Sequence, residues 1–211
     1  MIRVSLNRKG QGAVPVLGPM ELLVPPGETA AILGPSGVGK STLLRIVAGL
    51  DSAFDGTRQV PGRLGVVFQE PALLKWRSVV KNLTLMTGVS RAGALDLLAE
   101  VGLSGKAHLF PGQLSLGQQR RLSIARALAA EPQVLLLDEP FASLDPALVA
   151  DMAMLIRRAV RGRGATCLLV THSLNEAQML ADKSYRLIGQ PARLVPLESR
   201  LEPLRRAVSG D

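Results

Sequence analysis

Aromatic residues are scarce in this sequence, since Phe, Tyr and Trp together make up 3% of its 211 residues. A chain with so few rings lacks the stacking platform with which proteins hold single-stranded nucleic acid. We therefore expect no nucleic acid among its partners, although its formal net charge is +8. Basic side chains scattered in this way indicate solvated helix faces, contact with an anionic membrane surface, or phosphate binding.

Cysteine and long apolar runs are also nearly absent. Cys167 is the one cysteine of the chain, which excludes an intrachain disulfide and fits a reducing cytoplasm. The longest apolar stretches, such as residues 134–137, fall far short of the roughly 18 residues needed to cross a bilayer. The first residues do not have the pattern of a signal peptide. We therefore expect a cytoplasmic protein.

Short apolar strands alternate with helical patterns along most of the chain. Strands that are apolar throughout and are separated by helices predict a mostly parallel sheet covered on both faces, in an α/β fold. The opening segments suggest short antiparallel strands instead. The strands that we expect cover residues 2–6, 14–24, 29–33, 64–68, 134–137, 166–170, 184–188 and 193–197. The helices that we expect cover residues 41–50, 116–130, 146–161 and 173–181, with several Arg and Gln side chains of the second facing outward.

A glycine-rich loop lies between the strand at 29–33 and the helix that follows it. Residues 34–41 read GPSGVGKS and match the pattern G-x-x-x-x-G-K-[ST]. Main-chain N–H groups of such a loop surround nucleotide phosphates, Lys40 reaches the terminal phosphates, and the Ser41 hydroxyl binds Mg²⁺. We expect a nucleotide, identified below as ATP by a family resemblance, to contact Gly34, Pro35, Ser36, Gly37, Val38, Gly39, Lys40, Ser41 and Thr42.

Two acidic residues, Asp138 and Glu139, follow the apolar strand at 134–137. The carboxyl end of a parallel strand is where ligands bind in this class of fold. We expect Asp138 to hold Mg²⁺ directly or through water, and Glu139 to act as general base on the attacking water. A solvated acidic turn is the alternative, which the nearby phosphate loop disfavours.

Further segments resemble the ABC ATPase family in content and order. Residues 114–118, LSLGQ, resemble the LSGGQ signature, and Gln69 matches the glutamine of the Q-loop. Residues 143–145, SLD, match the D-loop, and His172 in the Thr-His pair matches the switch histidine. The resemblance extends over residues 33–172 and covers six motifs in the family's order.

The resemblance implies a P-loop NTPase core in a single ABC ATPase domain over residues 1–211. A RecA-like core with an N-terminal antiparallel β segment would consist of residues 1–70 and 131–200. A small helical lobe at 71–130 would carry the signature, in agreement with the helical spacing and weak strand signals of residues 78–106.

The resemblance also implies a site shared by two subunits packed head to tail. Ser115, Gly117 and Gln118 of one subunit would close over the ATP on the other subunit's phosphate loop. Gln69 would reach Mg²⁺ together with Ser41 and Asp138, and Asp145 would communicate between the two sites. The catalytic residues implied are Glu139, His172, Lys40 and Gln69, with His172 stabilising the γ-phosphate and the attacking water.

Two positions depart from the family pattern. Leu116 stands where the signature usually has glycine, and we expect it to be tolerated if its side chain points away from the nucleotide. The aromatic residue that usually stacks on adenine, about 25 positions before the lysine, is missing. As a hypothesis, adenine packs on Val14 or Val16, or under the guanidinium of Arg8.

Residues 68–83 resemble the Q-loop region of importer ATPases for nitrate, sulfonate, taurine and thiamine. This implies a homodimer or paired ATPase subunit on the cytoplasmic face of the inner membrane, with integral-membrane permease subunits and a solute-binding protein as partners. Exporter or lipid-extraction motors, soluble ABC ATPases and P-loop kinases are the alternatives, with importers favoured. Candidates for contact with the permease are Leu73, Leu74, Trp76 and Val79, with packing inside the helical lobe as the alternative for Trp76.

Overall fold

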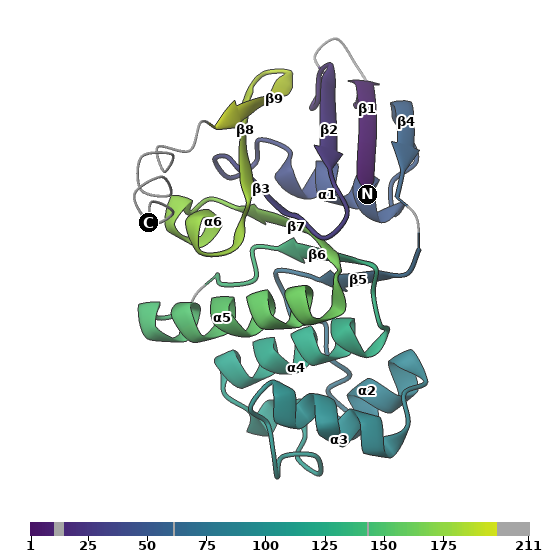
Figure 1. Ribbon diagram of the computed structural model, residues 1–211, viewed down its shortest axis with the longest axis vertical. Coiled ribbons are helices and arrows are strands. Elements are labelled where there is room, and N and C mark those ends of the chain that lie inside the picture. The colour runs from purple at the N-terminus through teal and green to yellow at the C-terminus, as the bar shows by residue number, and fades with distance from the viewer. Residues whose placement is uncertain (11–14, 61, 143, 198–211) are drawn as a thin grey trace, which may run out of the picture.

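The computed structural model describes residues 1–10, 15–60, 62–142 and 144–197, arranged as two sheets with helices between and below them (Figure 1). The smaller sheet has the order β2-β1-β4, and β1 pairs antiparallel with both neighbours. Its strands are β1 (Ile2–Arg8), β2 (Met20–Val24) and β4 (Asp55–Gln59). The sequence pattern did not predict β4, because its side chains are mostly exposed and it has no apolar alternation.

The larger sheet has the order β5-β6-β7-β3-β8-β9. All its neighbouring pairs are parallel except the pair β8 and β9, which is antiparallel. Its strands are β3 (Thr29–Leu33), β5 (Leu64–Val67), β6 (Val134–Asp138), β7 (Thr166–Thr171), β8 (Lys183–Gly189) and β9 (Ala192–Leu197). The mostly parallel α/β fold is therefore confirmed.

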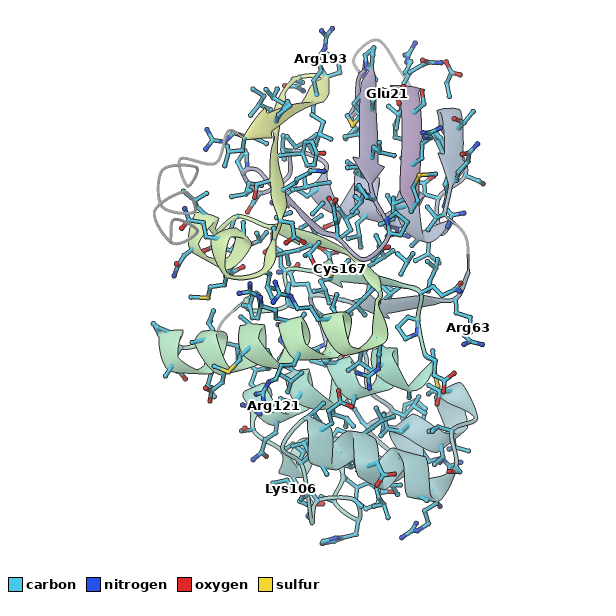
Figure 2. All side chains as sticks on the ribbon, viewed as in Figure 1. Glu21, Arg63, Lys106, Arg121, Cys167 and Arg193 are labelled. Atoms are coloured by element: carbon cyan, nitrogen blue, oxygen red, sulfur yellow. The ribbon has the colours of Figure 1, made fainter. Side chains whose placement is uncertain are left out.

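The two faces of the central strands supply two separate cores. In β6, Val134 and Leu136 pack with α1 and the smaller sheet, whereas Leu135 and Leu137 pack with the helices on the opposite face. Because successive side chains of a strand point to opposite faces, a strand covered on both sides must be apolar at every position. Cys167, labelled in Figure 2, lies in β7 as part of this core, and burial raises the pKa of its thiol to about 12.

Helices α2 and α3 pack on α4 at the end of the molecule farthest from the smaller sheet (Figure 1). In α4, Leu122, Ala125 and Leu128 are buried as predicted, but Arg120 is buried too, which corrects the expectation that the Arg side chains face outward. The helices are α1 (Lys40–Ala48), α2 (Val79–Thr87), α3 (Arg91–Glu100), α4 (Leu116–Ala129), α5 (Pro146–Arg163) and α6 (Leu174–Leu180), with a 3₁₀ turn at Pro111–Gln113. Within the described ranges, none of these helices has both the length and the apolar character of a membrane span.

The parallel strand order decides where the loops meet. Strands β5, β6, β7 and β3 are neighbours and run in one direction, so their carboxyl ends lie along one edge of the sheet. The loops that start after these ends therefore converge, as ligand-binding loops do in open α/β sheets. This edge carries the phosphate loop, the two acidic residues, Gln69 and His172.

Candidate functional site

The phosphate loop runs from the end of β3 to the start of α1, as the sequence predicted. Gly39 is the N-cap of α1 with φ 110°, a left-handed conformation that favours glycine. Gly34 is needed for a different reason, because a Cβ there would stand 2.8 Å from the main-chain oxygen of Leu187. The first N–H groups of α1 are thereby left available to an anion at the positive end of the helix dipole.

Lys40 is nearly buried, with an exposed fraction of 5%. Its Nζ donates to the main-chain oxygens of Gly34 at 2.9 Å and Pro35 at 3.1 Å. It also lies 3.3 Å from Oε1 of Glu139, so one ammonium group joins the phosphate loop to the end of β6.

Ser41 and Asp138 form the second link between these segments. The Ser41 hydroxyl donates a 3.1 Å hydrogen bond to Oδ1 of Asp138, which is 8% exposed. Burial raises the pKa of Asp138, and the nearby charge of Glu139 raises it further, while the bond from Ser41 and the charge of Lys40 lower it. A cation here would favour the ionised carboxylate.

The donor set of Ser41 and Asp138 fits Mg²⁺, which prefers hard oxygen ligands and keeps several waters. Among the described residues, no group of three or more His, Cys, Asp or Glu side chains could enclose a metal ion. Mg²⁺ in nucleotide sites takes one or two protein carboxylates together with substrate phosphates, so Ser41 and Asp138 are the residues that would hold it here.

Glu139 occupies the centre of the group. Its φ of 43° is unusual for a residue with a side chain, and its N–H donates to the main-chain oxygen of Val170 at 3.0 Å. Its Oε2 lies 3.4 Å from Nδ1 of His172, opposite the oxygen that meets Lys40. Such backbone conformations persist where surrounding bonds impose them, and they cluster at functional sites.

His172 follows β7 and exposes 56% of its side chain. The residue before it, Thr171, donates its hydroxyl to Oε2 of Glu176 on α6, and accepts a 3.0 Å bond from the N–H of Ser173. Burial raises the pKa of Glu176 above its ordinary value. Sequence reasoning missed Glu176, because only the fold brings the first turn of α6 against the end of β7.

Gln69 follows β5 at the same edge of the sheet, and its side chain is exposed. Its main-chain oxygen accepts a hydrogen bond from the guanidinium of Arg120. Gln69 therefore lies at the same edge of the sheet as the phosphate loop, and its main chain is attached to α4.

The signature residues lie elsewhere, at the start of α4. Ser115 is the N-cap and forms a capping box with Gln118, with bonds of 3.3 and 3.2 Å. Among the described residues, no hydrogen bond or ion pair links residues 115–118 to residues 34–42. Leu116 is 44% exposed, and a Cβ on Gly117 would stand 3.3 Å from the Leu148 side chain. One chain therefore does not bring the signature to its own phosphate loop.

Three further expectations concern the surroundings of the site. Val16 is 46% exposed, and its Cγ1 lies 3.3 Å from where a Cβ on Gly39 would stand, so Val16 adjoins the phosphate loop. Val14 and Ser143 lie outside the described residues. Asp145 is the N-cap of α5 and accepts a 3.0 Å bond from the N–H of Leu148.

The segment expected to meet a permease presents Trp76, which is 69% exposed. Val79 was a wrong candidate for this contact, because it is fully buried where α2 packs into the core. The fully buried side chain of Asn82 accepts a 2.8 Å bond from the N–H of Leu74 and donates to the main-chain oxygens of Leu74, Arg77 and Ser78 at 3.1 Å each.

Comparisons with known proteins place this geometry in a family. The family model described as ABC transporter matches residues 17–142. The aliphatic sulfonates import ATP-binding protein SsuB 1 of Rhodococcus jostii is 45% identical over 181 residues, which cover 83% of this chain and 74% of that protein. The protein of the same name from Pseudomonas fluorescens is 46% identical over 200 residues, covering 92% of this chain and 75% of its own length.

Among solved structures, the ATP-binding cassette MJ0796 in a dimeric post-hydrolysis state with ADP and Pi has a TM-score of 0.82 to this chain. It is 28% identical and covers 95% of this chain and 99% of its own. These matches confirm the family, the fold and the ATPase activity that the motifs predicted. With the phosphate loop joined to Asp138 and Glu139 and His172 beside them, the chain belongs to the ABC transporter family as one of its ATP-hydrolysing cassettes.

Proposed function

We propose that this chain is the motor subunit of a solute importer, in which two cassettes close over ATP and drive a separate permease. The observation that carries this proposal is the division of the site within one chain. Lys40, Asp138, Glu139 and His172 gather at one edge of the sheet, whereas Ser115 lies at the start of α4 without a bond to the phosphate loop. A second subunit is the natural source of the missing part.

Within the closed site, each residue has a role that its position supports. The Lys40 ammonium stabilises charge on the terminal phosphates, and the carboxylate of Glu139 takes the proton of the attacking water. His172, 3.4 Å from Glu139, supports the same water and the γ-phosphate. Ser41, Asp138 and Gln69 would hold Mg²⁺, which would neutralise charge that develops on phosphate oxygens. Ser115, Gly117 and Gln118 contact the ATP bound to the partner subunit. Asp145 transmits changes between the two ATP sites.

The permease contact of this proposal is the loop around Trp76. Its backbone is held by the buried amide of Asn82, so the exposed indole is presented from an ordered base. A large exposed ring on an ordered loop is typical of a protein contact. Leu73 and Leu74 are partly buried, and Leu73 packs against the core. The helical region at 71–130 would then move as a lobe against the core.

The solute is proposed from the relatives. The proteins SsuB 1 of Rhodococcus jostii and Pseudomonas fluorescens are named for aliphatic sulfonate import. We infer a small organic anion of the sulfonate class, chosen by the permease and a solute-binding protein and not by this chain. The motor would sit on the cytoplasmic face of the membrane.

Gel filtration of Glu139→Gln protein with and without Mg-ATP tests the proposal. Loss of the general base leaves ATP uncleaved, so the variant is expected to shift from monomer to dimer only with Mg-ATP. The matched control is Glu131→Gln, an exposed carboxylate before β6, which should hydrolyse ATP and show no stable dimer. A Glu139→Gln protein that binds ATP and stays monomeric, both alone and with its permease, would overturn the shared site.

A further inference from the structure

Arg120 connects three segments of the cassette. It lies on α4, five residues after Ser115, with an exposed fraction of 5%. One terminal nitrogen donates to the main-chain oxygens of Phe68, at 3.4 Å, and Gln69. The other donates to the main-chain oxygen of Ala142 at 3.4 Å. The same guanidinium therefore contacts the loop after β5 and the loop after β6.

The surroundings of Arg120 are unfavourable for a charge. Within the described chain, no carboxylate lies close enough to form an ion pair with it, and its Nε has no hydrogen-bond partner. Burial lowers the pKa of this guanidinium, against the weaker opposing effect of the Glu70 charge. A buried charge without an ionic partner costs more than an apolar or amide side chain of similar size. The main-chain oxygens of Phe68, Gln69 and Ala142 need a donor, but a neutral amide could supply one without a buried charge, so stability alone does not explain the charge at this position.

A second arginine of α4 holds the same loop farther along. Arg126 donates to the main-chain oxygens of Ala72 at 2.7 Å and Pro71 at 3.1 Å. The main chain of residues 68–72 is thus attached to α4 at both ends. A helix is stiff along its axis, so a displacement of this loop is transmitted along α4 to its first residues. Ser115 lies five residues before Arg120, which corresponds to about 7.5 Å at 1.5 Å per residue.

We propose that Arg120 is a positioning residue that couples the state of the ATP site to the orientation of the signature at Ser115. The inference rests on the proposed roles of Gln69 and Ser115. A displacement of the Gln69 main chain on nucleotide binding would move Arg120, and α4 would turn with it. Arg120 also donates to the main-chain oxygen of Ala142, three residues after Glu139. The same side chain is therefore attached to the loop that carries the general base. The fork of the guanidinium allows one side chain to hold both loops, which a lysine ammonium does less well.

The test separates coupling from structure by comparing Arg120→Gln, Arg120→Lys and Arg120→Met with Arg121→Gln. Arg121, labelled in Figure 2, is the neighbouring residue on α4, and it bonds to the main-chain oxygen of Val101 and meets Asp151 at 3.8 Å, away from the Q-loop. Each variant is assayed for thermal midpoint, ATP dissociation constant and the kcat and KM of ATP hydrolysis.

We expect Arg120→Gln, whose amide still donates to a main-chain oxygen, to bind ATP within about twofold of the parent chain and to keep most of the thermal midpoint, while kcat falls at least about tenfold. Arg120→Met leaves the main-chain oxygens of Phe68, Gln69 and Ala142 without their donor and should lower the thermal midpoint as well as kcat. Arg120→Lys should recover part of kcat, and Arg121→Gln should keep kcat. In the Glu139→Gln background, Arg120→Gln should require more Mg-ATP for the dimer shift.

An unchanged kcat, or a loss of kcat that follows a loss of thermal midpoint across the three variants, would overturn the coupling role. If Glu139→Gln with Arg120 intact fails to dimerise, the proposed shared site fails instead. A normal dimer shift of Glu139→Gln together with a parent-like kcat of the Arg120 variants would overturn the coupling alone, so the two failures are distinguished.

Discussion

The hydroxyl of Ser41 donates a 3.1 Å hydrogen bond to Asp138, although the two residues are 97 positions apart in the chain. This bond joins the first turn of α1 to the carboxyl end of β6. It places the two oxygen donors proposed for Mg²⁺ side by side, beside the ammonium of Lys40.

Replacing Asp138 by Asn removes a charge and keeps an oxygen that can accept from Ser41. We expect kcat to fall by about 10²–10³, because charge stabilisation at such a site is worth several kcal/mol. Ser41→Ala loses one neutral ligand and should lose less. ATPase assays over a range of Mg²⁺ concentrations provide the measurement, with a higher Mg²⁺ requirement in both variants. Parent-like Mg²⁺ dependence of Asp138→Asn would exclude the carboxylate as a ligand.

Glu176 predicts a pH dependence of stability. Burial raises its pKa in the folded chain above the unfolded value of 4.5, so folding disfavours the ionised form. The contribution of this residue to the free energy of unfolding therefore falls as pH rises from about 4.5 through the folded pKa, and then stays low. Glu176→Gln cannot ionise and should become more stable than the parent chain by a margin that grows over this window.

Urea unfolding of both proteins at several pH values between 4.5 and 8 measures that margin. Glu21→Gln, at a position on β2 that is exposed to solvent, serves as the matched control. A constant margin would show that the bonds from Thr171 and the start of α6 balance the effect of burial on the carboxylate, and a margin that shrinks with rising pH would show that they outweigh it; either result contradicts the prediction.

Asn82 is expected to be the residue that keeps the Trp76 loop in place. Asn82→Ala leaves main-chain groups of residues 74, 77 and 78 without their partner, which should lower the free energy of unfolding by about 2–4 kcal/mol. Denaturant unfolding followed by circular dichroism gives the value. Asn175→Ala, on the exposed surface of α6, should stay within about 0.5 kcal/mol of the parent chain. A similarly small change for Asn82→Ala would refute this account.

Val16 is expected to contact the base of the nucleotide. An aliphatic side chain has no hydrogen-bond donor or acceptor that could distinguish the bases. The dissociation constants for ATP and GTP should therefore agree within a few-fold, which is a difference in binding free energy of about 1 kcal/mol at most. Val16→Tyr adds a stacking ring and should tighten binding of both nucleotides by about tenfold, since base stacking on a ring is worth about 1–3 kcal/mol. Fluorescent-nucleotide titration measures this, and strong discrimination for ATP in the parent chain would contradict it.

Several features of this protein could be read from the sequence, because they depend on local patterns. Residues 29–33 form a strand with the predicted bounds, since an apolar run between turns has few other stable conformations in a covered sheet. The phosphate loop could also be predicted, because its glycine pattern is local in the sequence. The structure shows why glycine is needed, since Gly39 has a left-handed conformation and Gly34 lies close to another main-chain segment. The six motifs in order then implied the family.

The tertiary structure alone decided which distant groups meet. Strand order places β6 between β5 and β7, and this order brings Glu139 to Lys40 and His172. Arg120 looked like a surface residue, and only the packing of α4 against the loop after β5 buries it. Helical and strand periodicity specify which face of a segment is apolar, but not which segment covers that face. That choice depends on the summed burial of all the elements, and so it emerges only when they fold together.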